Sequence, residues 1–378
     1  MKLKTFGILC IIFCFLVAAA FYALKKDPFE HQGRMGERLF ADLPANAITR
    51  IQLIGPTREV RLKKGASVWE VENRYDYPAD FDKIADMIKK IRDLKVGRTF
   101  TADSGVKQRL ALLDPQASGK VEDDQKGTRV ILFSDGDAPP VLDLLIGKAR
   151  EGDGVSGGHH IMRMGAAHDE TVYLVDQSFR FLSTDPDDWL DKSLVDVAPE
   201  EVRQVTCYDA VSGDLLYRLT RSAKGKAPDL EGISEDESAE PSKIERVFGA
   251  LSGLTIDGVA GHRGVVDFAG LFNPRRFEYR LFDGSLYTLE TGKQGGDGGD
   301  RNYLTIATGY EQPPQTDGGE NASDEGTGIK GSAETDMPAV NEKMQQLNER
   351  FQPWTFTIST WKYEGLIYDR KALLKQKS

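Results

Sequence analysis

The segments TRVILF at residues 128–133 and LDLLIGK at residues 142–148 have the pattern of two paired β-strands, and a second such pair follows at residues 277–282 (FEYRLF) and 286–293 (LYTLETGK). Their apolar residues alternate with polar ones or form a short apolar run, as is typical of antiparallel sheets. Both pairs end in Gly-Lys. Because the match continues in the same order through both halves of the chain, we predict an internal duplication.

The similarity extends to the segments around these two pairs. Each pair follows a leucine-containing turn that ends in Asp-Pro or Asn-Pro, RLALLDP at residues 109–115 and FAGLFNP at residues 268–274. The remaining strands are predicted at residues 48–54, 59–63, 67–71 and 171–175 in the first half and at residues 199–208, 215–220 and 354–358 in the second. Each half is expected to close with a short helical turn, at residues 188–192 and 367–373.

One amphipathic helix is predicted in each half, between the early strands and the turn. In the first half, Asp80 is expected to cap a helix with Phe81, Ile84, Ile88, Ile91 and Lys95 on one stripe. In the second half, Ser242 and Glu245 have the spacing of a capping box. The apolar stripe of this second helix consists of Ile244, Val247, Phe248, Leu251 and Leu254.

The N-terminus contains the apolar run FGILCIIFCFLVAAAFYAL at residues 6–24, which has no charged residue. A helix needs about 20 apolar residues to cross a bilayer, so this run predicts a single membrane anchor. A cleaved signal peptide remains the alternative, because Ala18 and Ala20 have the small side chains that signal peptidase recognises. We expect the anchor, since the run continues beyond the usual apolar length of a signal, with the bulk of the chain exported to the periplasmic side of the inner membrane.

The predicted architecture is therefore α+β, with a transmembrane helix followed by two similar halves of antiparallel hairpins packed on single helices. An acidic insertion at residues 311–339 and a polar stretch at residues 223–240 are expected to be disordered, because they have little apolar surface to bury. The predicted parts are a cytoplasmic head at residues 1–5, the anchor at 6–24, a juxtamembrane spacer at 25–45, the first repeat at 46–197 and the second repeat at 198–378.

Composition excludes some classes of partner and of covalent cross-link. The formal net charge is −10, which disfavours nucleic acid and anionic lipid headgroups as partners. Two of the three cysteines, Cys10 and Cys14, lie in the apolar run. Cys207 therefore has no other cysteine in the soluble part with which to form a disulfide.

The chain resembles a family of membrane-anchored bacterial proteins known as domain of unknown function 4340. The resemblance rests on the N-terminal anchor, on SVWEV at residues 67–71 followed by YPAD at 77–80, on LLDP at 112–115, on IGK at 146–148, and on VYLV at 172–175 before Asp191-Lys192. It implies an exported companion of a gliding-type ABC transporter, with a transporter subunit as the protein partner. It implies no catalytic, cofactor-binding or metal-binding residues.

The motif GVSGG at residues 154–158 matches the Gly-x-Ser-x-Gly pattern of a hydrolase, with Ser156 at its centre. A nucleophile elbow requires a strand running into the serine and a helix leaving it, whereas here a loop precedes the motif and a strand follows. The neighbours His159 and His160 are adjacent on that strand, so they point to opposite faces and cannot share a metal ion. His168, Asp153 and Asp169 add no recognisable ligand spacing. We therefore predict no catalytic, cofactor or metal site.

The sequence favours a non-enzymatic, membrane-anchored accessory protein that supports ABC-type transport or envelope assembly. Two alternatives remain open. One is an envelope hydrolase that uses the loop around Ser156, and the other is a glycan- or peptide-binding module that uses a cleft between the halves. The four tryptophans, Trp69, Trp189, Trp354 and Trp361, are expected to pack in the core rather than to bind a ligand.

Overall fold

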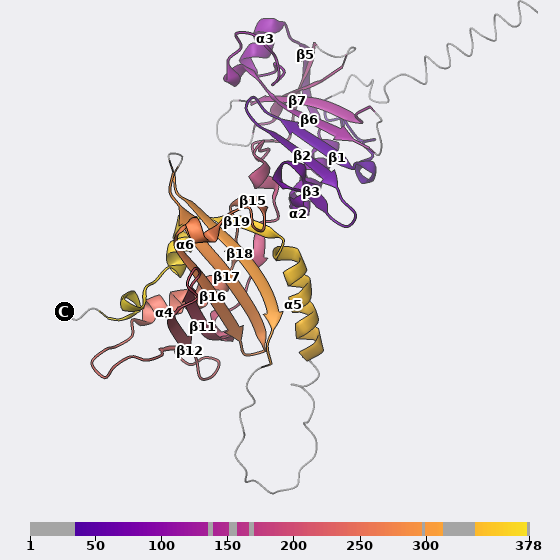
Figure 1. Cartoon of the computed structure of the whole chain (residues 1–378). Helices are drawn as coiled ribbons and strands as arrows, with labels where there is room; N and C mark the ends of the chain where they lie inside the picture. The colour runs from indigo at the N-terminus through magenta and orange to yellow at the C-terminus, as the bar shows by residue number, and fades with distance from the viewer. Residues whose placement is uncertain are drawn as a thin grey trace, which may run out of the picture. The chain divides into compact units, whose positions relative to one another are not determined.

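The computed structural model describes residues 35–134, 139–150, 157–165, 170–296, 299–312 and 337–375. The chain is an α+β protein built mostly from antiparallel strands, which confirms the α+β part of the predicted fold class (Figure 1). The predicted head and anchor and the first part of the spacer, at residues 1–34, lie outside the described residues. No helix within the described ranges combines the length and the apolar character that are needed to cross a bilayer.

The chain divides into two compact units. Unit 1 consists of Met1–Asn73 and Pro78–Trp189, and unit 2 consists of Arg74–Tyr77 and Leu190–Ser378. Arg74–Tyr77 therefore belongs to unit 2, although it lies within the first half of the sequence.

A nine-stranded sheet in the order β4-β3-β2-β1-β6-β7-β8-β9-β5 belongs to unit 1, except that Tyr77 of its edge strand β4 is assigned to unit 2. Its neighbours pair antiparallel, with the hairpin β6–β7 near the middle. The strands are β1 (Arg50–Ile54), β2 (Glu59–Lys64), β3 (Trp69–Val71), β4 (Tyr77–Pro78), β5 (Val96–Thr101), β6 (Thr128–Phe133), β7 (Leu142–Ala149), β8 (His159–Arg163) and β9 (Thr171–Val175). The helices are α2 (Phe81–Arg92) and α3 (Ser104–Arg109), with 3-10 turns at η1 (Ala45–Ala47), η2 (Glu72–Arg74), η3 (Asp123–Gln125) and η4 (Pro186–Trp189).

Unit 2 contains an eight-stranded sheet in the order β13-β12-β11-β16-β17-β18-β19-β15 and a small sheet formed by β10 and β14. The strands are β10 (Ser193–Val195), β11 (Val202–Asp209), β12 (Leu215–Thr220), β13 (Asp229–Leu230), β14 (Leu254–Thr255), β15 (Gly258–His262), β16 (Phe272–Leu281), β17 (Ser285–Gln294), β18 (Arg301–Tyr310) and β19 (Trp354–Ile358). The helices are α4 (Pro241–Phe248), α5 (Met337–Phe351) and α6 (Thr360–Leu366), with 3-10 turns at η5 (Pro199–Glu201), η6 (Gly249–Leu251), η7 (Phe268–Gly270) and η8 (Arg370–Leu373).

The two large sheets have the same strand order when they are matched along the chain. The order β3-β2-β1-β6-β7-β8-β9-β5 in unit 1 corresponds to β13-β12-β11-β16-β17-β18-β19-β15 in unit 2. In each unit one helix, α2 or α4, precedes the strand that returns to the far edge of the sheet. The two hairpins with the shared Gly-Lys ending, β6–β7 and β16–β17, occupy the same place in both sheets.

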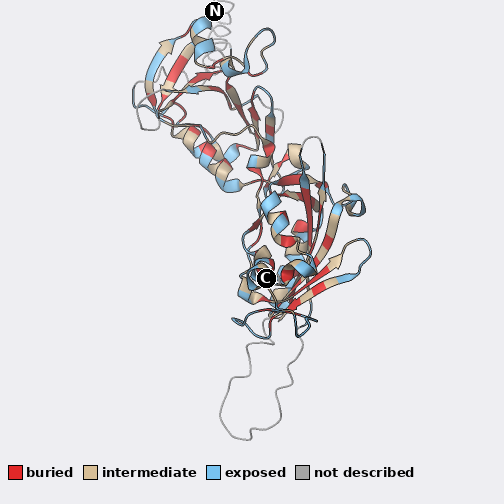
Figure 2. Ribbon diagram, turned by 90° about the vertical axis from the view of Figure 1, so that its left-hand side faces the viewer, coloured by how far each residue is buried: buried red, intermediate tan, exposed pale blue. Residues whose placement is uncertain are grey.

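Helix α2 has the cap and the buried face that its sequence predicts. The side chain of Asp80 accepts a hydrogen bond from the Lys83 backbone N–H at 3.0 Å. Ile84, Ile88 and Ile91 are buried, together with Met87. Phe81 was expected on the same stripe, but it is the first residue of the helix and its side chain is 60% exposed. Figure 2 shows buried residues gathered in the strands and on one side of the helices.

Helix α4 lacks the predicted capping box. It begins at Pro241, and Glu240 occupies the N-cap position without a capping hydrogen bond from its side chain. The Ser242 hydroxyl donates to Glu240 at 3.0 Å instead, and Glu245 accepts from Arg221 at 3.4 Å. The predicted burial of Ile244, Val247 and Phe248 is confirmed, because a helix face is fixed by spacing whichever residue caps it.

Both stretches expected to be disordered contain ordered structure. In the first, residues 313–336 lie outside the described residues, but Glu311 is bound to Arg280 and α5 begins at Met337. Helix α5 lies alongside β18 (Figure 1) and covers the part of that strand which β19 leaves unpaired. In the second, Leu230 of β13 is buried and pairs with Leu219. A single buried leucine in a polar stretch is enough to add a short edge strand.

Candidate functional site

A pocket of ≈ 420 Å³ lies in unit 2 between α6 and the end of α4 with η6. Its size falls within the range of small-molecule or side-chain binding pockets, about 300–1,000 Å³. Much of its wall is formed by small residues, which leave the space open: Gly249, Ala250, Ser252, Gly253 and Gly365. The side chains that give the pocket its chemistry are Arg246, Trp361, Lys362 and Glu364. We call this surface the α6 pocket.

Trp361 is exposed at the rim of the α6 pocket. Its exposed fraction is 71%, whereas Trp69 and Trp189 are buried and Trp354 is partly buried. The prediction that all four tryptophans pack in the core is therefore wrong for Trp361. The buried face of α6 is made by Tyr363 and Leu366, which are three residues apart, and Trp361 does not lie on that face.

Lys362 is held in place against the neighbouring sheet. Its Nζ donates to the carbonyl oxygen of Thr255 at 2.7 Å and also to the Thr255 hydroxyl. Partial burial lowers the pKa of the Lys362 ammonium. The same Nζ lies 5.5 Å from the centroid of the Trp361 ring, a distance that permits a cation–π contact. The pocket thus combines a fixed cation with an exposed indole.

Arg246, the second cation of the pocket, also has a defined position. Its Nη1 donates to the Tyr368 hydroxyl at 3.2 Å. Glu364 is the one acidic residue among those that line the pocket. The two cations and the indole suit a ligand group that is partly apolar and carries a carboxylate or another hydrogen-bond acceptor.

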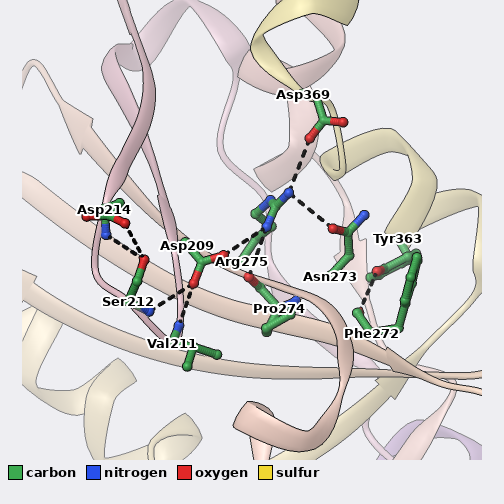
Figure 3. Close-up of polar contacts among 10 residues, drawn as sticks. All are labelled: Asp209, Val211, Ser212, Asp214, Phe272, Asn273, Pro274, Arg275, Tyr363 and Asp369. Carbon is green, nitrogen blue, oxygen red and sulfur yellow. Dashed lines mark hydrogen bonds and ion pairs between the residues drawn. The ribbon is translucent and has the colours of Figure 1, made fainter.

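Arg275 is the centre of a polar network that joins strands of the large sheet of unit 2 to the C-terminal segment (Figure 3). The residue is 8% exposed and lies on β16. Its Nη1 donates to Asp209 at 3.4 Å, and its Nη2 donates to Asn273 at 3.1 Å and to Asp369 at 3.2 Å. Asp209 ends β11 and Asp369 precedes η8, so one guanidinium joins two strands to the C-terminal segment.

The acceptor groups of this network are themselves fixed. Asp209 accepts hydrogen bonds from the backbone N–H groups of Ser212 and Val211, both at 2.9 Å, and these bonds lower the pKa of its carboxyl group. The Tyr363 hydroxyl of α6 donates to the carbonyl oxygen of Phe272 at 3.4 Å (Figure 3). Helix α6 is therefore attached to the start of β16, and the Arg275 network holds the segment that follows α6.

The family model for a domain of unknown function (DUF4340) matches residues 69–274. The chain belongs to this family. The matched range covers 206 of 378 residues (274 − 69 + 1), from β3 of unit 1 to the Asn-Pro phrase in β16 of unit 2. No curated protein and no solved structure matches the chain. The α6 pocket of this DUF4340 protein is formed partly by residues beyond the matched range, because α6 begins at Thr360.

Cys207 lies in the core of unit 2, on β11. Burial raises the pKa of its thiol to about 12. A thiol that stays protonated is a poor nucleophile and a poor metal ligand, so Cys207 packs as an apolar residue.

The loop motif of this DUF4340 protein is only partly within the described residues. Ser156, Asp153, His168 and Asp169 lie outside them. No group of three or more potential metal ligands occurs among the residues that the structure describes.

His159 and His160 differ in environment, as expected for neighbours on one strand. His159 is buried, and its Nδ1 accepts a hydrogen bond from the Phe179 backbone N–H at 3.3 Å. Burial lowers the pKa of the His159 imidazole. The Nδ1 of His160 lies 3.0 Å from the carbonyl oxygen of Lys148 and is partly exposed. Their opposite directions on β8 follow from the twofold alternation of a strand.

Proposed function

We propose that this DUF4340 protein is a non-enzymatic, membrane-anchored accessory protein that binds a protein partner, such as a subunit of an ABC-type transporter. In this proposal residues 6–24 anchor the chain in the inner membrane, and the two units work on the periplasmic side in transport or envelope assembly. The observation that supports partner binding is the exposed Trp361 beside the α6 pocket.

An exposed tryptophan next to an open pocket is suited to protein recognition. Tryptophan and arginine are enriched among the residues that dominate the binding energy of interfaces. Trp361 and Arg246 are both on short helices that are fixed by hydrogen bonds to neighbouring segments. Side chains on helices that are already held in place lose less conformational entropy on binding. A small surface can therefore bind with useful affinity.

Site-specific photo-crosslinking in membranes tests the partner. A photoreactive residue at position 361 should crosslink to a transporter subunit, and Trp361→Ala should weaken co-purification of that subunit by about tenfold or more. Phe81 is the matched control, because it is also an exposed aromatic residue but lies in unit 1. Equal crosslinking from positions 81 and 361, or a partner that is no component of a transport or envelope system, would contradict the proposal.

The anchor is tested separately. The full-length protein should stay in the membrane pellet after carbonate extraction, and its C-terminus should become accessible to protease only when the outer barrier is opened. A mature chain that begins at Phe21 would show that the N-terminal segment is a cleaved signal.

The hydrolase alternative depends on Ser156. Under our proposal the variant Ser156→Ala preserves the cellular phenotype, because this side chain takes part in no chemistry. We leave His159 unchanged, since its burial makes a substitution there a test of stability. Loss of phenotype with an unchanged melting temperature would instead favour a hydrolase.

A further inference from the structure

Strand β5 is an edge strand, and within the described residues its outer side is paired only at its beginning. It ends the nine-stranded sheet of unit 1 and spans six residues, whereas the edge strands β4 and β13 span two each. Strand β15, the remaining edge, is interrupted by a register shift between Val259 and Gly261. Natural proteins usually shorten, bend or cover the edges of their sheets. Among the described strands, β5 is the longest edge strand; it also has a register shift, between Val96 and Arg98, and pairs regularly with β9 from Arg98 to Thr101.

The backbone groups on the outer side can be assigned from the pairing with β9. The Ala102 backbone N–H donates to Glu170, and Phe100 is paired with Val172. Because N–H groups alternate along an antiparallel strand, those of Thr99 and Thr101 point away from β9. Among the described residues, those at 36–39 pair with the beginning of the strand, where the Gly36 backbone N–H donates to Val96 at 2.7 Å, and none is paired with Thr99 or Thr101 on this side. Both threonines are exposed.

A pocket of ≈ 310 Å³ lies on the sheet face next to this edge. Its apolar part is formed by Phe100, Val106, Leu110 and Leu174, and its basic part by Arg98, Arg109 and His160. None of the described residues that line it is acidic. The Arg98 guanidinium lies 5.8 Å from the Phe100 ring, and the Phe100 and His160 rings meet edge to face at 6.3 Å. The pocket therefore offers an apolar floor with a basic rim.

We propose that β5 accepts an extended acidic segment of a partner protein as an additional strand. The partner backbone pairs with Thr99 and Thr101, and every second side chain of the segment points to the face that carries Arg98 and Phe100. One apolar side chain enters the pocket, and carboxylates on either side of it meet Arg98 and Arg109. This surface is in unit 1, and the proposal is independent of the α6 pocket.

The charge distribution specifies this class of partner. The chain carries a net charge of −10, and residues 311–336, with seven Asp or Glu and one Lys, supply −6 of it. Among the described residues, those that line the pocket include the basic side chains of Arg98, Arg109 and His160 and no acidic one, so the pocket favours an acidic ligand. Main-chain pairing then supplies affinity, and the pocket and its rim supply specificity.

Peptide selection on the full-length chain tests the proposal. Short random peptides displayed on phage are selected against the wild-type protein, and the enriched peptide is then titrated by fluorescence anisotropy. We expect enriched sequences in which a large apolar residue is flanked by Asp or Glu at alternate positions. Thr99→Pro should weaken their binding by about tenfold or more, because proline removes an N–H that the fold itself does not use.

Matched variants separate backbone pairing from charge. Thr99→Ala keeps the N–H and should bind like the wild type. Arg98→Glu with Arg109→Glu should reject the acidic peptide and bind its Lys-for-Glu counterpart, while Arg92→Glu, on α2, should change nothing.

Four outcomes would overturn the proposal. The first is enrichment without acidic residues, and the second is binding that survives Thr99→Pro. The third is equal binding of the acidic peptide and of hexanoate, which would identify a site for free anions. The fourth is self-association of the chain that Thr99→Pro abolishes, which would identify a second copy as the occupant. Melting curves check that each variant is folded.

Discussion

Arg275 connects three segments that are distant in sequence, so its replacement acts on all of them. We predict that Arg275→Met lowers the free energy of unfolding by about 1–3 kcal/mol, because Asp209, Asn273 and Asp369 lose a shared donor. Urea unfolding measures the change. Asp369→Asn is the control, and its effect should be much smaller, because the Asp369 side chain is 73% exposed and water replaces its partner. If the two variants lowered the free energy of unfolding equally, the stabilisation would not depend on the burial of Arg275.

Cys207 gives a pH dependence whose sign follows from burial. The folded protein holds the pKa of the thiol at about 12, above the ordinary value near 8.5 that applies to the unfolded chain. The thiol's contribution to stability is therefore complete below about pH 8.5 and is lost as the pH rises toward 12. We expect iodoacetamide to modify Cys207 at pH 8 only after unfolding in urea, as measured by peptide mapping that separates it from Cys10 and Cys14. Rapid modification of the native protein would contradict this.

Helix α5 covers the edge of strand β18. The Asn348 side chain accepts a hydrogen bond from the Thr308 backbone N–H at 3.0 Å, and the Thr308 hydroxyl donates to the carbonyl oxygen of Met344 at 2.6 Å. Asn348→Ala should lower the free energy of unfolding by about 1 kcal/mol and speed hydrogen exchange at Thr308. Glu349→Ala on the exposed side of the helix is the control. Unchanged exchange at Thr308 would mean that α5 does not cover this edge in solution.

The segment between β18 and α5 gives a second prediction for an element. Residues 311–336 contain seven Asp or Glu and one lysine, so they have little to bury. Replacing residues 313–336 by a short Gly-Ser linker should leave the melting temperature within a few degrees, since halving a loop changes the closure free energy by only about 0.6 kcal/mol. Extending the deletion through Phe351 should destabilise unit 2, because it removes α5. A loss of the folded state with the shorter deletion would show that the segment packs.

The sequence was sufficient to predict most strands but not the candidate site. The predicted bounds of β6, β9 and β12 agree with the observed ones; β12 alternates between buried and less buried residues, whereas β6 and β9 are marked by short apolar runs with consecutive buried residues. Helix α6 was missed, since only Tyr363 and Leu366 mark its buried face and the helix is too short for a periodic signal. Trp361 was therefore assigned to the core by residue type alone. The α6 pocket depends on the distance between α4 and α6. The pattern of apolar and polar residues along the sequence does not predict this distance.

At the scale of the whole molecule, the common strand order of the two sheets accounts for the repeated sequence phrases. The turn phrase at residues 109–115 lies before β6 and the one at residues 268–274 runs into the start of β16, the strand at the corresponding position in the other sheet. The exposed features have nevertheless diverged. Unit 1 has the basic pocket beside β5, whereas unit 2 has the α6 pocket and the added helix α5. One architecture with different surfaces is consistent with two separate binding roles.

The short segment Arg74–Tyr77 shows that the units do not follow the order of the sequence. Tyr77 is fully buried in unit 2, where its ring meets Trp354 edge to face at 5.3 Å and Phe356 at 5.8 Å. Removing a buried aromatic ring leaves a cavity, so Tyr77→Ala should lower the free energy of unfolding by about 3–5 kcal/mol. Tyr77→Phe keeps the ring and serves as the control.

Hydrogen exchange measured by mass spectrometry locates this effect within the chain. We expect faster exchange in β15 and β19 of unit 2, because these strands carry or adjoin the aromatic residues that contact Tyr77, and unchanged exchange in β1, β2 and β6 of unit 1. Faster exchange in unit 1 alone would contradict the assignment of Tyr77 to unit 2. Hydrogen exchange reports the stability of each unit separately. Comparing the two units therefore tests whether Tyr77 belongs to unit 2, as its contacts indicate, or to unit 1, as its position in the sequence would suggest.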